Sequence, residues 1–284
     1  MKRAADHLEL LRSTLRIGTL YADLDGTILG PGGSLFASEE GVTTQPAEAI
    51  AKLARAGVDV VLVSGRTRAQ IREVARVVGA RAYVAELGGI LVYRESGRET
   101  VVRVEGVSRR LGTAHEAIQR SGAAGLLLEA YRGRLEPHAP WAFAERECSV
   151  LLRGNVDEDE ARTILHRAGH DWLDIQDNGV IPHRPGRFPG LEVEEVHAYH
   201  LVPAGISKRS AVALDRTRRG LRPESCIVVG DSASDAEVAP EVGAVFIVHN
   251  GEPGLRGRDL AGNVYLLDRQ HGLGFADVVE AFTS

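Results

Sequence analysis

The chain has 284 residues, of which 44% are hydrophobic and 26% are charged, and its formal net charge is −5 at pH 7. These values are typical of a globular protein with one large or two moderate domains. The acidic balance and the scattered basic residues argue against nucleic acid as a partner. The two cysteines lie far apart in apolar surroundings, which predicts buried free thiols and a cytoplasmic protein. No stretch approaches the ~20 apolar residues of a membrane span, so no membrane partner is expected.

The first 85 residues alternate between predicted strands and helices. Apolar runs at 17–22 and 58–63 predict buried strands, and apolar residues at helical spacing predict helices from Pro46 and over 67–78. Alternation of this kind with short connections is typical of a parallel, doubly wound sheet. We therefore expect an α/β fold.

The middle of the chain has a different pattern. Strands are predicted at 90–104, 142–147, 148–153, 172–175, 180–183 and 197–202, and helices at 108–120 and 157–168. Asp177-Asn178-Gly179 is interpreted as a turn. Paired strands among helices predict an α+β unit inserted into the core, which assigns 86–202 to the insert and 1–85 with 203–284 to the core.

Strand and helix alternation resumes after the insert. Helices are predicted at 207–218, at 234–242 and after Gly274, with strands at 226–229 and 244–248. The second half of the core therefore has the same α/β character as the first.

Two clusters of aspartate follow predicted strands at opposite ends of the chain. Asp23-Leu24-Asp25-Gly26-Thr27 follows the strand at 17–22, and Gly230-Asp231-Ser232-Ala233-Ser234-Asp235 follows the strand at 226–229. Because the carboxyl ends of parallel strands meet in the crevice where open α/β sheets bind ligands, we expect the two clusters to converge. Carboxylates in one crevice repel one another unless a cation joins them. The sequence therefore predicts a hard divalent cation with oxygen ligands, most often Mg²⁺.

Four segments, in order along the chain, resemble the motifs of the haloacid dehalogenase superfamily, whose members are mostly phosphatases. These segments are Asp23-Leu24-Asp25-Gly26-Thr27, Ser64-Gly65-Arg66, Lys208 and Gly230-Asp231-Ser232-x-x-Asp235. The long insertion before Lys208 is similar in position to the type-two cap, and the approach to this lysine resembles the Cof-like branch. Glu86-Leu87-Gly88 stands where that branch commonly has Glu-Asn-Gly. The resemblance implies a Rossmann-like core with an inserted α+β cap.

The resemblance also implies roles for these residues. Asp23 would be the nucleophile that forms an aspartyl-phosphate, and Asp25 would be the general acid and base, with Ser64 and Lys208 completing the catalytic set. The implied Mg²⁺ ligands are Asp23, Asp231, Asp235 and the backbone carbonyl of Asp25. The implied phosphate ligands are Asp23, Gly26, Thr27, Ser64, Gly65 and Lys208. The alternatives are an N-cap role for Ser64 and a solvated helix lysine at position 208.

The basic loop His183-Arg184-Pro185-Gly186-Arg187 lies in the predicted insert. His183, Arg184 and Arg187 offer hydrogen-bond donors, so this loop is the sequence candidate for binding an anionic or polyhydroxylated leaving group. A solvated surface loop is the alternative interpretation.

The leading hypothesis is a Mg²⁺-dependent phosphomonoesterase that acts on a small sugar- or glycerate-linked phosphate. By resemblance, relatives include phosphatases of mannosyl-3-phosphoglycerate and of sucrose phosphate. A phosphosugar mutase shares this core and cap and stays an alternative, as does a non-catalytic phospholigand-binding protein. The partner we expect is a small phosphorylated metabolite, and the expected assembly is a monomer or a homodimer.

Overall fold

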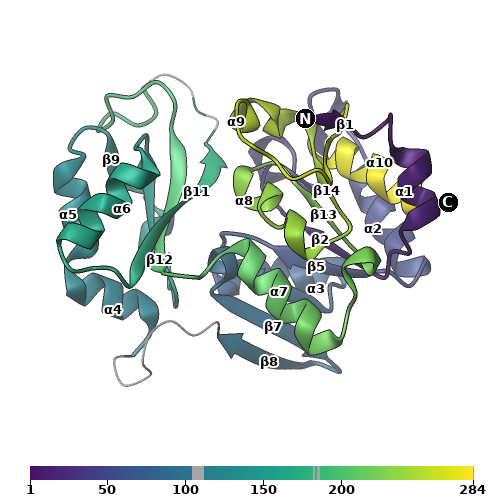
Figure 1. Ribbon diagram of the computed structural model, residues 1–284, viewed down its shortest axis with the longest axis horizontal. Coiled ribbons are helices and arrows are strands. Elements are labelled where there is room, and N and C mark those ends of the chain that lie inside the picture. The colour runs from purple at the N-terminus through teal and green to yellow at the C-terminus, as the bar shows by residue number, and fades with distance from the viewer. Residues whose placement is uncertain (104–111, 182, 184–185, 284) are drawn as a thin grey trace.

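The structure, a computed structural model, describes residues 1–103, 112–181, 183 and 186–283. The described residues form two units that lie side by side (Figure 1). The larger unit contains the N-terminus and the last helix, and the smaller unit is built from the middle of the chain.

The described part of the larger unit is organised around a nine-stranded sheet in the order β1-β15-β14-β13-β2-β5-β6-β7-β8. Neighbouring strands from β1 to β6 run parallel, and β7 and β8 are added antiparallel at one edge. In sheet order the strands are β1 (Lys2–Arg3), β15 (Val264–Leu266), β14 (Ala244–Ile247), β13 (Cys226–Gly230), β2 (Thr19–Ala22), β5 (Asp59–Val63), β6 (Ala82–Ala85), β7 (Ile90–Glu95) and β8 (Arg98–Arg103). A separate pair, β3 (Ala37–Ser38) and β4 (Gly41–Val42), forms a two-stranded ribbon.

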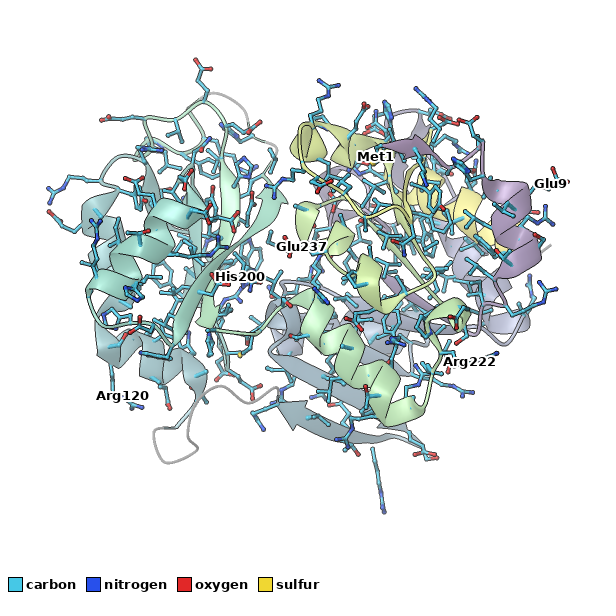
Figure 2. The ribbon with its side chains drawn as sticks, viewed as in Figure 1. Met1, Glu9, Arg120, His200, Arg222 and Glu237 are labelled. Atoms are coloured by element: carbon cyan, nitrogen blue, oxygen red, sulfur yellow. The ribbon has the colours of Figure 1, made fainter. Side chains whose placement is uncertain are left out.

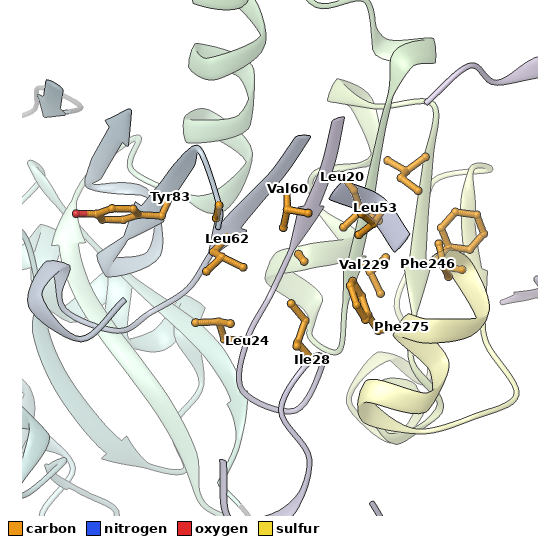
Figure 3. Close-up of a cluster of buried hydrophobic side chains, with 14 of the residues drawn as sticks. Leu20, Leu24, Ile28, Leu53, Val60, Leu62, Tyr83, Val229, Phe246 and Phe275 are labelled. Carbon is orange, nitrogen blue, oxygen red and sulfur yellow. The ribbon is translucent and has the colours of Figure 1, made fainter. Parts of the chain in front are cut away.

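Helices cover both faces of this sheet, which confirms the predicted doubly wound α/β fold. One face packs against α1 (Leu8–Thr14), α2 (Gln45–Arg55), α3 (Arg68–Val78) and α10 (His271–Thr283). The other face packs against α7 (Lys208–Arg219), α8 (Ala233–Ala236) and α9 (Glu252–Leu255). Successive side chains of β2 point to opposite faces of the sheet. Leu20 belongs to the buried cluster on the first face, which Figure 3 shows, and Tyr21 belongs to the cluster on the other face.

Local capping explains where the helices next to the site begin. The side chain of Thr67 accepts a hydrogen bond from the Gln70 backbone N–H at the start of α3, and the Thr67 backbone N–H donates to Gln70 Oε1. Ser207 and Ser210 form the same reciprocal arrangement at the start of α7. These caps set the first turn of each helix beside the strand ends of the sheet.

The smaller unit, called the cap below, contains a four-stranded antiparallel sheet in the order β11-β12-β10-β9. The strands are β11 (Leu173–Val180), β12 (His197–Pro203), β10 (Val150–Gly154) and β9 (Leu135–Pro137). One face of this sheet packs against α4 (Ala114–Ser121), α5 (Ala123–Ala130) and α6 (Glu158–Arg167), and the other face is turned toward the larger unit (Figure 1).

The predicted border at residue 86 does not coincide with the border of the large sheet. The β7–β8 hairpin, which the prediction assigned to the insert, pairs with β6 in the register Ala85↔Ile90. A strand-turn-strand pattern looks the same in either unit, because the sequence does not say which edge the hairpin joins. We propose that the cap begins after Arg103.

Other predicted elements also differ from the structure. The strand predicted at 142–147 is not formed, because its first two residues lie in a short 3-10 helix, Trp141–Phe143, and the next strand, β10, begins at Val150. The strands predicted at 172–175 and 180–183 are a single strand, β11, which ends at Val180. Asp177-Asn178-Gly179 lies within β11 at an irregularity in the register, because β12 supplies a pairing partner that the sequence does not reveal. The predicted helix at 234–242 is divided into α8 and a 3-10 turn at Ala239–Glu241, since Pro240 cannot continue the first helix. The first part of the predicted helix at 108–120 lies outside the described residues, and α4 begins at Ala114.

Both cysteines are buried free thiols, as predicted. Among the described residues, none of the helices combines the length and apolar character that crossing a bilayer requires.

Candidate active site

The two aspartate clusters follow adjacent strands. Asp23 comes directly after β2 and Asp231 directly after β13, and these strands pair in parallel through Val229↔Ala22. The Asp23 backbone N–H donates to the carbonyl of Val229 at 3.0 Å, which extends the pairing by one residue. The chain leaves β2 toward β5 on one side and returns through β13 on the other, so the site lies where the strand order reverses.

The loop after Asp23 packs closely against Asp231. Gly26 has a backbone φ of +85°, and a Cβ atom at this position would lie 2.0 Å from Asp231 Oδ2. Only glycine combines this backbone conformation with so close an approach. The hydroxyl oxygen of Thr27 lies 3.5 Å from Asp23 Oδ2 and 3.4 Å from Asp231 Oδ1, so it stands between the two carboxylates.

Lys208 joins the two clusters from the first turn of α7. Its Nζ donates to Asp23 Oδ1 at 3.0 Å and to Asp235 Oδ1 at 2.9 Å, and only 1% of the side chain is exposed. Burial disfavours the ammonium, but the charges of Asp23 and Asp235 outweigh it and hold the pKa of Lys208 above its usual range. The alternative of a solvated helix lysine is therefore excluded.

Asp235 is fixed by the loop that carries Asp231. Its Oδ2 accepts from the backbone N–H of Ser232 at 3.1 Å, from the Ser232 hydroxyl at 2.6 Å and from the Asp231 N–H at 3.3 Å. One carboxylate oxygen thus faces the loop while the other faces Lys208. The hydroxyl of Ser234 lies 2.9 Å from that of Ser232, so it supports the same loop.

The carboxylates of Asp23, Asp231 and Asp235 offer oxygen atoms that all lie within 4.8 Å of one another. Burial, together with the charges of Asp235 and Asp25, raises the pKa of Asp23 to about 7 against the opposing attraction of Lys208. Burial and the charges of Asp23 and Asp235 also raise the pKa of Asp231. One lysine does not neutralise this cluster, and an all-oxygen donor set at this spacing fits a hard divalent cation.

The side chain of Asp25 stands apart from this cluster. Arg66 holds it in a forked ion pair, with Nε 2.7 Å from Oδ2 and Nη2 2.6 Å from Oδ1. The Asp25 side chain is 55% exposed, whereas that of Asp23 is 7% exposed. The sequence predicted Asp25 as a site residue but gave no role to Arg66, although the Ser-Gly-Arg motif contains it.

Ser64 and Gly65 follow β5, the other neighbour of β2. The Ser64 side chain is buried, and its oxygen accepts from the Arg66 backbone N–H at 3.2 Å. The alternative that Ser64 is the N-cap of the following helix is wrong, because Thr67 has that position in α3. The four predicted core motifs thus end at the same edge of the sheet.

Asn250 and His271 support the loop after Asp23. Both side chains contact the Gly26 carbonyl at 2.9 Å, through Asn250 Nδ2 and His271 Nδ1. The Asn250 amide also lies 3.5 Å from Asp231 Oδ2. The role of His271 carries no sequence signal, since a single histidine at the start of a helix is not a motif.

Glu86 connects the core to the cap. Its side chain is fully buried, and it accepts from the backbone N–H groups of Glu147, Cys148 and Ser149 at 2.7, 3.0 and 2.8 Å. The Ser149 hydroxyl adds a fourth hydrogen bond at 2.9 Å. The first residue of the Glu86-Leu87-Gly88 segment is therefore a core carboxylate that binds the strand entering the cap sheet.

The basic loop of the cap lies beside Phe188. His183 packs against the Phe188 ring at 5.2 Å between centroids, and the Arg187 guanidinium lies 5.2 Å from the same ring. His183 Nδ1 lies 3.2 Å from the Ile181 carbonyl. Arg184 lies outside the described residues. The assignment of these three residues to the leaving group stays a prediction.

Comparison with known proteins agrees with this geometry. Residues 20–125 match the haloacid dehalogenase-like hydrolase family. A phosphoglycolate phosphatase of Methanoculleus marisnigri is 29% identical over 93% of this chain and 96% of its own length. Another, of Methanospirillum hungatei, is 24% identical over 91% of this chain and 97% of its own length.

Solved structures show the same fold at low sequence identity. The sucrose-phosphatase of Synechocystis, in complex with sucrose and phosphate, has a TM-score of 0.61 at 17% identity and covers 94% of this chain and 98% of its own. A protein of Thermoplasma acidophilum has a TM-score of 0.60 at 16% identity, with the same coverage of 94% and 98%.

The fold is a Rossmann-like core with an α+β cap. The chain is similar to haloacid dehalogenase-like hydrolases over residues 20–125 and to two curated phosphatases over more than nine-tenths of its length.

Proposed function

We propose that the chain hydrolyses a small phosphomonoester with Mg²⁺, using Asp23 as the nucleophile. The observation that carries this proposal is the buried contact of Asp23 with Lys208, which also binds Asp235, beside Asp231. A carboxylate in this position is fixed in direction and close to a cation, and Mg²⁺ bound beside it would favour its anionic form. These are the requirements of a nucleophile that attacks a phosphate ester.

The proposed substrate is the phosphate ester of a small hydroxy acid, such as a phosphoglycolate or a phosphoglycerate. The relatives named phosphoglycolate phosphatase align over more than nine-tenths of this chain, which supports an ester of this size. The glycerate-type ester predicted from the sequence belongs to the same chemical class. Mannosyl-3-phosphoglycerate and sucrose phosphate are larger esters, and they serve as test substrates.

In the first proposed step, one oxygen of the Asp23 carboxylate attacks phosphorus. The ester P–O bond breaks, its electron pair passes to the leaving oxygen, and Asp25 donates a proton to that oxygen. The aspartyl-phosphate is then hydrolysed: water attacks the same phosphorus while Asp25 takes its proton. The P–O bond to Asp23 breaks, and inorganic phosphate leaves.

The surrounding residues have separate tasks in this scheme. Lys208 keeps its charge because two buried carboxylates stabilise it, so it orients Asp23 and neutralises charge on the phosphoryl oxygens. Asp231, Asp235 and Asp23 would hold Mg²⁺, which offsets the repulsion between an anionic nucleophile and an anionic ester. In this scheme Ser64 and Gly65 would hydrogen-bond the transferred group. Arg66 fixes the direction of Asp25.

A panel of phosphate esters tests the proposal. Purified protein with Mg²⁺ is incubated with 2-phosphoglycolate, the phosphoglycerates, glycerol phosphates, sugar phosphates and p-nitrophenyl phosphate, and released phosphate is measured. We expect the small hydroxy-acid esters to have the highest kcat/KM, and EDTA to abolish hydrolysis. Full activity in EDTA, or preference for a large sugar phosphate, would contradict the proposal.

A further inference from the structure

The cap presents two polar side chains to the core beside Gly65. On β12, Tyr199 and Leu201 pack into the apolar core of the cap, so His200 between them points to the opposite face. Figure 2 shows His200 on the side of the cap that faces the larger unit. On β11, Ile175 points into the cap core, while the amide of Gln176 on the other face donates to the Ile206 carbonyl. Asn178 follows on this same face.

His200 and Asn178 both reach the backbone of the Ser64-Gly65 motif. A Cβ atom added at Gly65 would lie 2.6 Å from Asn178 Nδ2 and 2.7 Å from His200 Nε2. The cap thus approaches residue 65 so closely that only glycine fits there, and both nitrogen atoms lie near it. Gly65 is the residue after Ser64, so this point of contact lies next to the proposed phosphate position.

Hydrogen bonds from the core determine which nitrogen of His200 carries its proton. The Ser149 hydroxyl has one proton, and it donates this proton to the buried Glu86 carboxylate at 2.9 Å. The Ser149 oxygen is then an acceptor for the His200 Nδ1, which lies 3.2 Å away. We therefore assign the proton of the neutral imidazole to Nδ1, which leaves a lone pair on Nε2.

His200 remains neutral in these surroundings. Burial and the positive charges of Arg146 and Lys208 hold the pKa of His200 well below its usual range. Among the residues that the structure describes, neither His200 Nε2 nor the Asn178 amide has a hydrogen-bond partner, and Asn178 Oδ1 is buried without one. Buried polar groups without partners are uncommon unless a ligand or water completes them.

We propose that His200 and Asn178 form a subsite for a hydroxyl group of the leaving alcohol. The proposal rests on the proposed function and adds the substrate feature that the cap selects. His200 Nε2 accepts the hydroxyl proton, and Asn178 Nδ2 donates to the hydroxyl oxygen. A carboxylate offers no proton to Nε2, so it fits this pair less well than a hydroxyl does. The substrates that this subsite selects are therefore esters with a free hydroxyl near the ester bond, such as phosphoglycerates.

The test compares two esters that differ by one hydroxyl group, 3-phosphoglycerate and 3-(phosphonooxy)propanoate. A site that hydrogen-bonds a substrate hydroxyl rejects the analogue without it, so we expect kcat/KM to favour 3-phosphoglycerate by at least about tenfold. His200→Asn retains a donor near Nδ1 but has no atom at Nε2. For this variant, the ratio of kcat/KM for 3-phosphoglycerate to kcat/KM for the analogue is expected to fall below about threefold. His200→Gln places an amide oxygen near Nε2, so its ratio should lie between that of His200→Asn and that of the wild type. Hydrolysis of p-nitrophenyl phosphate should change little in either variant.

His115→Asn is the matched control. His115 also contacts Ser149, with Nδ1 2.7 Å from its backbone carbonyl, but it lies on α4. We expect this variant to retain the wild-type ratio. A wild-type ratio near one, an unchanged ratio in His200→Asn, or an equal loss in His115→Asn would overturn the hydroxyl subsite while leaving the phosphatase proposal intact. Failure to hydrolyse any ester with Mg²⁺ would overturn both.

Discussion

The catalytic cluster of the core and the polar face of the cap are built in different ways. In the core, Asp23 and Asp231 are the residues that directly follow two paired parallel strands, and Lys208 starts a helix beside them. In the cap, the environment of His200 depends on Ser149, which directly precedes β10, and on Glu86 from the core. The difference indicates that the chemistry at phosphorus is encoded in short segments, whereas recognition of the leaving group depends on how distant segments pair.

The largest effect should come from the nucleophile, at the centre of the core cluster. Asp23→Asn is nearly isosteric but far less nucleophilic, so kcat should fall by about 10⁴-fold or more on every substrate. Steady-state phosphate release measures this loss. Asp268→Asn, which changes an exposed partner of Arg3, is the control and should retain full activity. Substantial activity in Asp23→Asn would exclude the aspartyl-phosphate route.

Asp25→Asn should give a loss that depends on the leaving group. Alkyl phosphates need a proton on the departing oxygen, so we expect about 10² to 10⁴-fold lower kcat/KM for them. The loss of kcat/KM on p-nitrophenyl phosphate should be smaller, because its leaving group needs no proton. kcat/KM is compared on both substrates in one preparation because, unlike kcat, it does not include hydrolysis of the intermediate. Equal losses would count against Asp25 as the general acid.

The pH dependence of stability tests the burial of the catalytic carboxylates. Burial raises the pKa of Asp23 to about 7, above its value in the unfolded chain. The protonated form is thus favoured in the folded state, so this contribution is fully present below about pH 4 and is lost as the pH rises through about 7. The melting temperature of the metal-free protein should therefore fall over this range.

Mg²⁺ should raise the melting temperature more at about pH 8 than at about pH 5, because protons compete for the same carboxylate oxygens. Thermal unfolding with and without Mg²⁺ measures both trends. In Asp23→Asn the decline with pH should be smaller. A metal-free protein whose stability rises steadily between about pH 4 and 8 would contradict the account.

Glu86→Gln tests the link between core and cap. The amide keeps the shape of Glu86 but brings a donor against the N–H groups of the cap strand, so the free energy of unfolding should fall by about 1–3 kcal/mol. The preference for 3-phosphoglycerate over its analogue without the hydroxyl should fall in the same variant. Urea unfolding measures the free energy of unfolding, and Glu129→Gln, which changes an exposed partner of Arg132, is the control. Unchanged stability would show that these contacts do not hold the cap.

The basic loop of the cap gives the smallest expected effect. His183 packs against Phe188 and contacts its own loop at Ile181, so His183→Ala should change kcat/KM for the preferred ester by less than about threefold. A selective loss of about tenfold or more, with p-nitrophenyl phosphate unaffected, would assign the leaving group to this loop rather than to His200.

The sequence predicts the core well for a local reason. Each catalytic residue follows an apolar strand or begins a capped helix, so a few neighbouring residues determine where Asp23, Asp231 and Lys208 lie. The parallel sheet then brings them together without further information. The ion pair of Arg66 with Asp25 was not predicted, because its geometry depends on two loops that only the folded sheet brings together.

The cap was harder to predict because its strand limits and the faces of its side chains depend on antiparallel pairing between segments that lie far apart in the sequence. Asp177-Asn178-Gly179 has the composition of a turn, yet pairing with β12 keeps it within a strand and turns Asn178 to Gly65. Helix α5, with the sequence AAGLLLEA, has no polar stripe that would identify it as a helix. His200 belongs to no sequence motif, and only the strand register shows that it faces the larger unit.

The central claim is that Asp23 carries the phosphoryl group. The most direct measurement uses Asp25→Asn, in which the intermediate should accumulate because water is no longer activated for the second step. The variant is mixed with p-nitrophenyl phosphate, whose leaving group needs no proton, so that only the second step is slowed. The mixture is quenched in acid within the first turnover and reduced with borohydride, and the peptides are examined by mass spectrometry. Conversion of Asp23 to homoserine is the predicted result, because borohydride reduces the acyl-phosphate. Phosphate release in the first turnover would contradict the account if Asp23 stayed unmodified throughout, or if another residue were reduced instead of Asp23.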